Sequence, residues 1–83
     1  MLNESKIEMA INSKVIYITK HIMNNTKYDE ENALKLFMST KLYKILLEKK
    51  SGLYLEPVGF LIDALHIELE KSEEAMREYI YRE

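Results

Sequence analysis

The stretch KKSGLYLEPVGF, residues 49–60, contains both glycines and the single proline of the chain. Gly52 is typical of the left-handed residue that ends a helix, and Pro57 is typical of the first turn of the next one. Because Pro57 also holds Glu56 extended, we expect a short extended segment at about residues 52–56. In such a segment Leu53 and Leu55 would enter the core while Tyr54 faces the surface.

The rest of the chain favours helix, because it lacks Gly and Pro and is rich in Lys, Glu, Leu, Ile and Met. Helices are expected over about residues 5–24, over 30–38 after an N-cap at Asp29, from about residue 41 to Ser51-Gly52 after a cap signal at Ser39-Thr40, and from Pro57 to at least Leu69 and on to about Ile80. The second and third of these could also be one bent helix. The sequence predicts one compact all-α domain of three or four helices spanning residues 1–83.

Composition excludes several classes of protein. The 83 residues include no cysteine, so neither a disulfide framework nor a thiolate metal site is available. No stretch is apolar enough to span a membrane, and the first ten residues lack the features of a secretory signal. We therefore expect a soluble cytoplasmic protein with no membrane partner.

Charge is divided between the two halves of the chain. Residues 1–50 contain nine lysines against six acidic residues, a net +3, while residues 51–83 carry a net −5. The halves could attract one another within one molecule or head to tail between two molecules.

Candidate catalytic and metal residues are few. Asp63, His66, Glu70 and Glu73 would share one side of the last helix, which is more typical of a solvated face than of a metal site. The other histidine, His21, lies far away in the sequence, so an acid/base pair with His66 would depend on the fold. No glycine-rich phosphate loop is present. We expect a protein that is not an enzyme and that has no cofactor, metal or small-molecule substrate.

Two helices carry a second apolar stripe besides the one that a small core requires. These stripes predict an interface in which an apolar face is covered by a partner, unless both helices are sandwiched inside the monomer. The most economical partner is a second copy in a symmetric dimer. The predicted interface residues are Met9, Ile16 and Met23 of the first helix, Phe60 and Ile67 of the last, and Leu53 and Tyr54 at an edge.

A DNA-binding regulator is the alternative prediction. The two short helices over residues 30–50 could form a helix-turn-helix, with phosphate contacts from Lys41, Lys44, Lys49 and Lys50. The absence of arginine from the first 50 residues and the pI near 5.7 make nucleic acid an unfavoured partner.

The order of motifs resembles that of short uncharacterised bacterial domains. The shared elements are an apolar first helix, an A-x-x-L-F helix at residues 33–37, a Y-x-x-L helix at residues 43–46 and a Gly-Leu-Tyr-Leu segment at residues 52–55. The resemblance covers about residues 7–70, includes no catalytic motif, and implies an accessory or antitoxin-like binding role. Together with the stripes, it leads us to expect a non-enzymatic, self-associating protein–protein interaction module.

Overall fold

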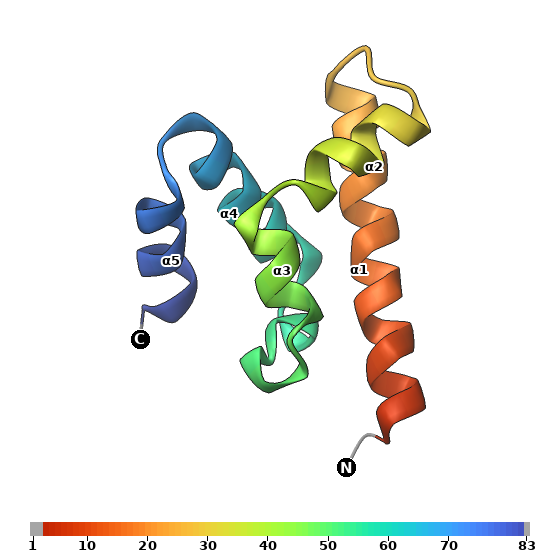
Figure 1. The fold of residues 1–83 in the computed structure, drawn as a ribbon, viewed down its shortest axis with the longest axis vertical. Helices are drawn as coiled ribbons and strands as arrows, with labels where there is room; N and C mark the ends of the chain where they lie inside the picture. The colour runs from red at the N-terminus through yellow and green to blue at the C-terminus, as the bar shows by residue number, and fades with distance from the viewer. Residues whose placement is uncertain (1–2, 83) are drawn as a thin grey trace.

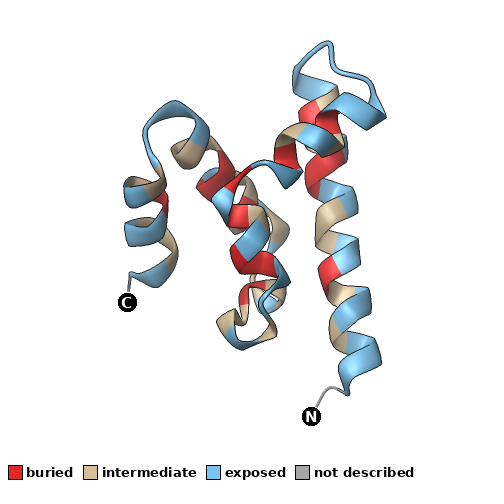
Figure 2. Cartoon of the chain, in the orientation of Figure 1, coloured by how far each residue is buried: buried red, intermediate tan, exposed pale blue. Residues whose placement is uncertain are grey.

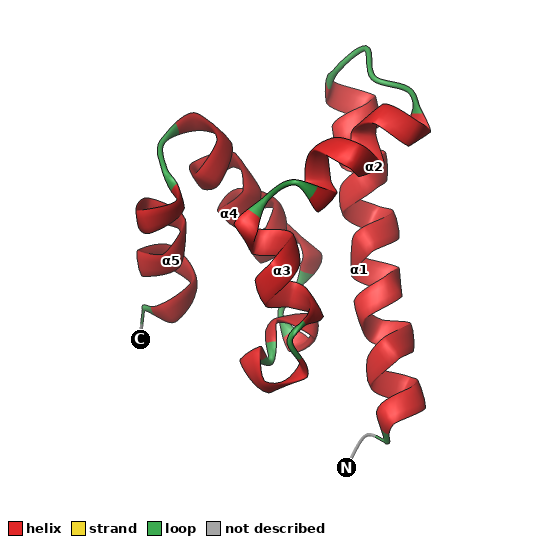
Figure 3. Cartoon of the chain, in the orientation of Figure 1, coloured by secondary structure: helices red, strands yellow, loops and turns green. Residues whose placement is uncertain are grey.

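The computed structural model describes residues 3–82 and, over that range, contains five α-helices and no strand (Figures 1 and 3). The predicted all-α fold is confirmed. The helices are α1 (Glu4–Asn25), α2 (Glu30–Met38), α3 (Lys41–Leu47), α4 (Val58–Glu70) and α5 (Glu73–Tyr81). Helix α3 ends at Leu47, before the end expected at Ser51-Gly52, because residues 49–51 form a separate 3-10 turn, η1 (Lys49–Ser51). A second 3-10 turn, η2 (Leu53–Leu55), completes the connection to α4.

Four of the helices start at a side chain that accepts a hydrogen bond from a backbone N–H three residues later. This contact satisfies one of the donors left free at a helix start. The caps are Asn3 on α1, Asp29 on α2, Thr40 on α3 and Ser72 on α5, at 2.9–3.1 Å. The caps expected at Asp29 and Thr40 are thus present, and α2 and α3 are separate helices.

The expectation of one continuous helix from Pro57 to Ile80 is wrong. The backbone N–H groups of Lys71 and Ser72 both donate to the Ile67 carbonyl, which closes α4. Ser72 then caps α5, which packs back against α4 (Figure 1). Because of this reversal Met76 is fully buried, whereas Leu69, expected on the same stripe, is 47% exposed.

The extended segment expected at residues 52–56 is also wrong in its central part. Gly52 is left-handed (φ 71°) and Glu56 is extended, as predicted, but the residues between them form a 3-10 turn. In such a turn, successive side chains are about 120° apart rather than on alternating sides. Leu53 is therefore buried, Tyr54 is half-buried, and Leu55 is 66% exposed instead of entering the core.

The core lies where α1, α2, α3 and α4 meet (Figure 2). Helix α1 contacts α2, α4 and η2, while α5 contacts α4 at the opposite edge of the molecule (Figure 1). None of the helices in residues 3–82 is long and apolar enough to cross a membrane. The largest side chains with almost no exposed surface are Ile18, Phe37, Leu42, Leu46, Leu61, Leu65 and Met76.

Candidate functional site

An exposed apolar strip follows the side of α1 that faces away from the core. Met9 is 67% exposed, Ile16 53% and Tyr17 58%. They border a shallow groove of about 400 Å³ that also includes Asn12, Ser13 and Lys20. We call these six residues the outer face of α1.

The helical repeat of α1 explains this exposure. Ile11, Ile18 and Ile22 occur at the spacing of one helix face and are buried against the core. Met9 and Ile16 project from the opposite side, where the described part of the chain has no element packed over them. Asn12 and Ser13 are short side chains between these larger ones, so the strip is hollowed in its middle.

The structure separates the other predicted interface residues from this strip. Phe60 and Ile67 are half-buried and pack against the core cluster, and the Phe60 ring stacks on Tyr79 of α5 at 4.9 Å between centroids. Their stripe is therefore covered within the monomer by α5. Met23 is likewise half-buried, while Leu53 is buried and Tyr54 is half-buried in the joint before α4.

A second, smaller groove adjoins the outer face. It has a volume of about 130 Å³ and is shared between α1 and α2, with Ile16 and Lys20 common to both grooves. Thr19 lines it and is 6% exposed, and its Oγ1 has no hydrogen-bond partner among the described residues. A buried hydroxyl without a partner carries a desolvation cost.

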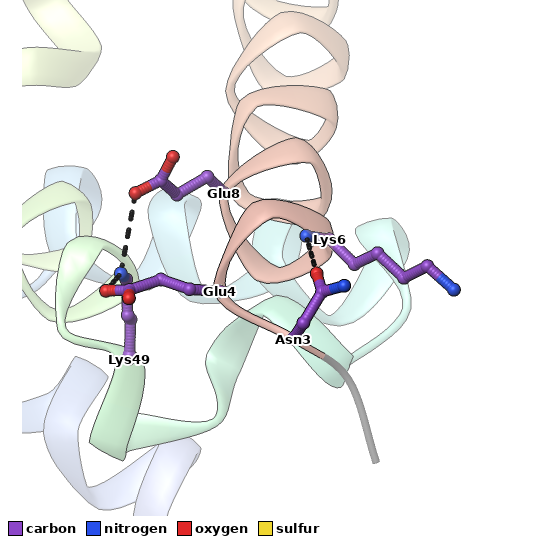
Figure 4. A network of polar contacts seen from close by, with 5 residues as sticks. All are labelled: Asn3, Glu4, Lys6, Glu8 and Lys49. Atoms are coloured by element: carbon purple, nitrogen blue, oxygen red, sulfur yellow. Dashed lines mark hydrogen bonds and ion pairs between the residues drawn. The ribbon is translucent and has the colours of Figure 1, made fainter.

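The lysines predicted for DNA binding are placed in different surroundings. Lys49 forms ion pairs with Glu4 and Glu8 of α1 (Figure 4). The hydrogen bond from Lys49 lowers the pKa of Glu4 below its ordinary value of 4.5, and the same bond raises the pKa of Lys49 above 10.5. Lys41, Lys44 and Lys50 are exposed.

The start of α3, which a recognition helix would present to phosphate, is occupied by a carboxylate. Glu68 of α4 accepts the backbone N–H of Lys41 at 2.7 Å and that of Leu42 at 2.9 Å. An anion already satisfies these donors, so the arrangement does not favour the helix-turn-helix interpretation. Sequence reasoning missed this contact because Glu68 lies 27 residues after Lys41.

The two histidines, far apart in the sequence, meet between α1 and α4. His21 Nε2 lies 3.0 Å from His66 Nε2, and His66 Nδ1 lies 3.3 Å from Glu70 Oε2. No group of three or more His, Asp or Glu side chains in residues 3–82 is arranged to hold a metal ion. The Asp63–Glu73 set considered from the sequence is divided, since Glu73 belongs to α5 and pairs with Arg77.

In comparisons with protein-family models, with curated proteins and with solved structures, the chain matched none of them. Function therefore has to be inferred from the geometry of the molecule itself.

Proposed function

We propose that the protein is a non-enzymatic interaction module that self-associates through the outer face of α1. The observation that carries this proposal is the exposure of Met9, and of Ile16 and Tyr17 about two turns later, around one groove. Clustered apolar side chains of this kind are typical of an interface that is covered by another protein.

A second copy of the chain fits this groove better than an unrelated surface does, because the outer face is self-complementary. Consider two α1 helices that pack antiparallel about a twofold axis near Ser13. Met9 of each copy then lies opposite Tyr17 of the other and beside its Ile16, since Met9 and Tyr17 are each four residues from Ser13 and Ile16 is three residues from it. The short side chains of Asn12 and Ser13 at the centre allow the helices to approach closely.

The same arrangement sets the strength and the salt dependence of the dimer. The outer face comprises six residues, against the roughly 20–30 residues a side of a stable interface, so we expect a weak dimer at high micromolar concentration. Lys20 of one copy faces Lys6 of the other, and both are exposed. Because salt screens like charges, dimerisation should strengthen as salt rises.

The test is sedimentation equilibrium across a concentration series, with Ile16→Glu as the disrupting variant. The matched control is Leu55→Glu, which introduces the same charge at an exposed leucine of η2. Wild type and the control should dimerise, while Ile16→Glu should stay monomeric. A wild type that is monomeric at high micromolar concentration would refute the proposal. Association that weakens with salt would instead indicate head-to-tail attraction between the oppositely charged halves.

A further inference from the structure

A chain of polar contacts joins α1 to α4 through the two imidazoles. It runs from Asn25 Nδ2 to His21 Nδ1 (3.3 Å), from His21 Nε2 to His66 Nε2 (3.0 Å), and from His66 Nδ1 to Glu70 Oε2 (3.3 Å). The ring centroids are 5.2 Å apart, which is close to the Nε2–Nε2 distance plus the radius of each ring. The two nitrogens therefore meet almost head-on, as in a hydrogen bond and unlike two ligands that converge on a metal.

The ends of this chain determine where the protons are. Asn25 Nδ2 also lies 2.8 Å from the His21 carbonyl oxygen, so this atom is the amide nitrogen and a donor. His21 Nδ1 must therefore accept, which leaves the proton of His21 on Nε2. At the other end the Glu70 carboxylate only accepts, so His66 carries its proton on Nδ1. Both ends of the chain of contacts therefore require the same direction for the hydrogen bond between the rings: His21 Nε2–H donates and His66 Nε2 accepts.

We propose that His21 and His66 form a proton-operated link between α1 and α4, which accepts one added proton and is broken by a second. The first proton binds His21 Nδ1 at the expense of the long contact with Asn25. It leaves the bond between the rings intact and charge-assisted. The second proton must bind His66 Nε2, so that two N–H groups and two positive rings face each other.

The charged surroundings support this assignment. Glu70 is the one charged group with a polar contact to either ring in the part of the chain that the structure describes. On α4, Asp63 contacts the Tyr79 hydroxyl of α5 and Glu68 accepts from the α3 amides. On α1, Lys14 lies two helical turns before His21. Glu70 holds the His66 Nδ1 proton, so the added protons are directed to the remaining nitrogens.

The sign of the effect on stability follows from the hydrogen bond that the second proton removes. In the unfolded chain the two imidazoles take up protons independently near pH 6.5. In mildly acidic solution a second added proton removes the hydrogen bond between the rings of the folded chain, whereas the unfolded chain has no such bond to lose. Stability should therefore fall as the pH decreases through this range. Loss of one hydrogen bond corresponds to a fall in Tm of about 4–8 °C in a domain of this size.

The first test is the tautomer of each ring, measured by long-range 1H–15N NMR of the wild type at pH 8. The chain has two histidines, so every imidazole signal belongs to this pair. One ring should carry its proton on Nε2 and the other on Nδ1, the less common form. Two rings that both carry it on Nε2 would overturn the proposal.

The second test is Tm between pH 7.5 and pH 5.0 for the wild type and for His66→Gln. The glutamine carbonyl can accept from His21 Nε2–H and does not titrate. We expect the wild type to lose about 4–8 °C more than this variant does. Equal losses would contradict the link. His21→Gln provides the same comparison from the other side, because its amide can donate to neutral His66 Nε2 and its carbonyl can accept from the protonated ring. Neither test depends on dimerisation, so this proposal and the proposed function can fail independently.

Discussion

Replacing Glu68 with alanine should destabilise the fold by removing the cap that α4 provides to α3. The carboxylate accepts the backbone N–H groups of Lys41 and Leu42 at 2.7 and 2.9 Å. Helix α3 has seven residues, too few to be stable without contacts to the rest of the molecule. The loss of these two contacts should therefore affect global stability and not the helix end alone.

The magnitude follows from the exposure of the two donors. A hydrogen bond to a charged group contributes about 1.5–3 kcal/mol when its loss leaves a buried partner. A helix cap contributes about 0.5–2 kcal/mol. Lys41 is exposed and its N–H regains water when Glu68 is removed, while Leu42 is buried. We expect a loss of about 2 kcal/mol, or a fall in Tm of roughly 8–16 °C in a domain of this size.

Urea and thermal unfolding, followed by circular dichroism at 222 nm, measure this loss. Glu78→Ala removes an exposed carboxylate from α5 and is the control, with an expected change within about 0.5 kcal/mol. Glu68→Gln keeps one accepting oxygen and should lose about 1 kcal/mol. Amide exchange of Lys41 and Leu42 should accelerate in Glu68→Ala. If Glu68→Ala is as stable as Glu78→Ala, the cap does not stabilise the fold and the reasoning is wrong.

Three further changes test other parts of the structure. Thr19→Val replaces a buried hydroxyl without a partner by a methyl group; it should raise the free energy of unfolding by about 1 kcal/mol, and a lower urea midpoint would contradict this. Met76→Ala should cost about 2–5 kcal/mol because Met76 is the fully buried side chain by which α5 packs on the rest of the molecule. Leu69→Ala should cost less than about 1 kcal/mol. If urea titrations show a larger loss for Leu69→Ala than for Met76→Ala, one continuous final helix would be the better description. The Glu4–Lys49 pair should stabilise the fold between pH 4.5 and 10.5. Its contribution should be lost as the pH falls through the lowered pKa of Glu4 or rises through the raised pKa of Lys49. Wild type and Lys49→Met should therefore converge in thermal unfolding at both extremes of pH, and a constant difference would contradict the pair.

The sequence alone predicts a helix boundary where that boundary depends on a contact between residues close together in the chain. Asp29 and Thr40 each cap a helix through a backbone N–H three residues later, so side-chain type and position predict the boundary. Gly52 at φ 71° is a further case, because a residue with a Cβ is strained in that conformation.

The break between α4 and α5 is marked by the same kind of local signal, an N-cap residue, but the apolar spacing across the break favours one continuous helix. Ser72-Glu73-Glu74-Ala75 repeats the pattern of Asp29-Glu30-Glu31-Asn32, a cap followed by two acidic residues. Apolar spacing across residues 58–80 is compatible with either one helix or two. The choice is made by burial of Met76 and stacking of Tyr79 on Phe60, and these contacts exist only after the chain has reversed.

Contacts between residues far apart in the sequence could not be predicted from helix-cap residues or from apolar periodicity. The sequence identifies His21 and His66 as the two imidazoles, but they meet only because α1 and α4 pack together. Glu68 likewise has no local feature that marks it as the cap of a helix formed 27 residues earlier.

The reversal of α5 also changes what the doubled stripes imply. With α5 packed on Phe60 and Ile67, the second stripe of α4 is covered by the chain itself. Only the outer face of α1 keeps large exposed apolar side chains from the predicted set, so the interface hypothesis reduces to one helix. Helix α1 also carries His21, one turn after Tyr17.

The interface and the proton link are thus adjacent on α1, yet they use different side chains. Ile16→Glu should therefore leave both histidine tautomers unchanged, and His66→Gln should leave the dimer unchanged. A change in either would show that the proton link and the interface are coupled through α1.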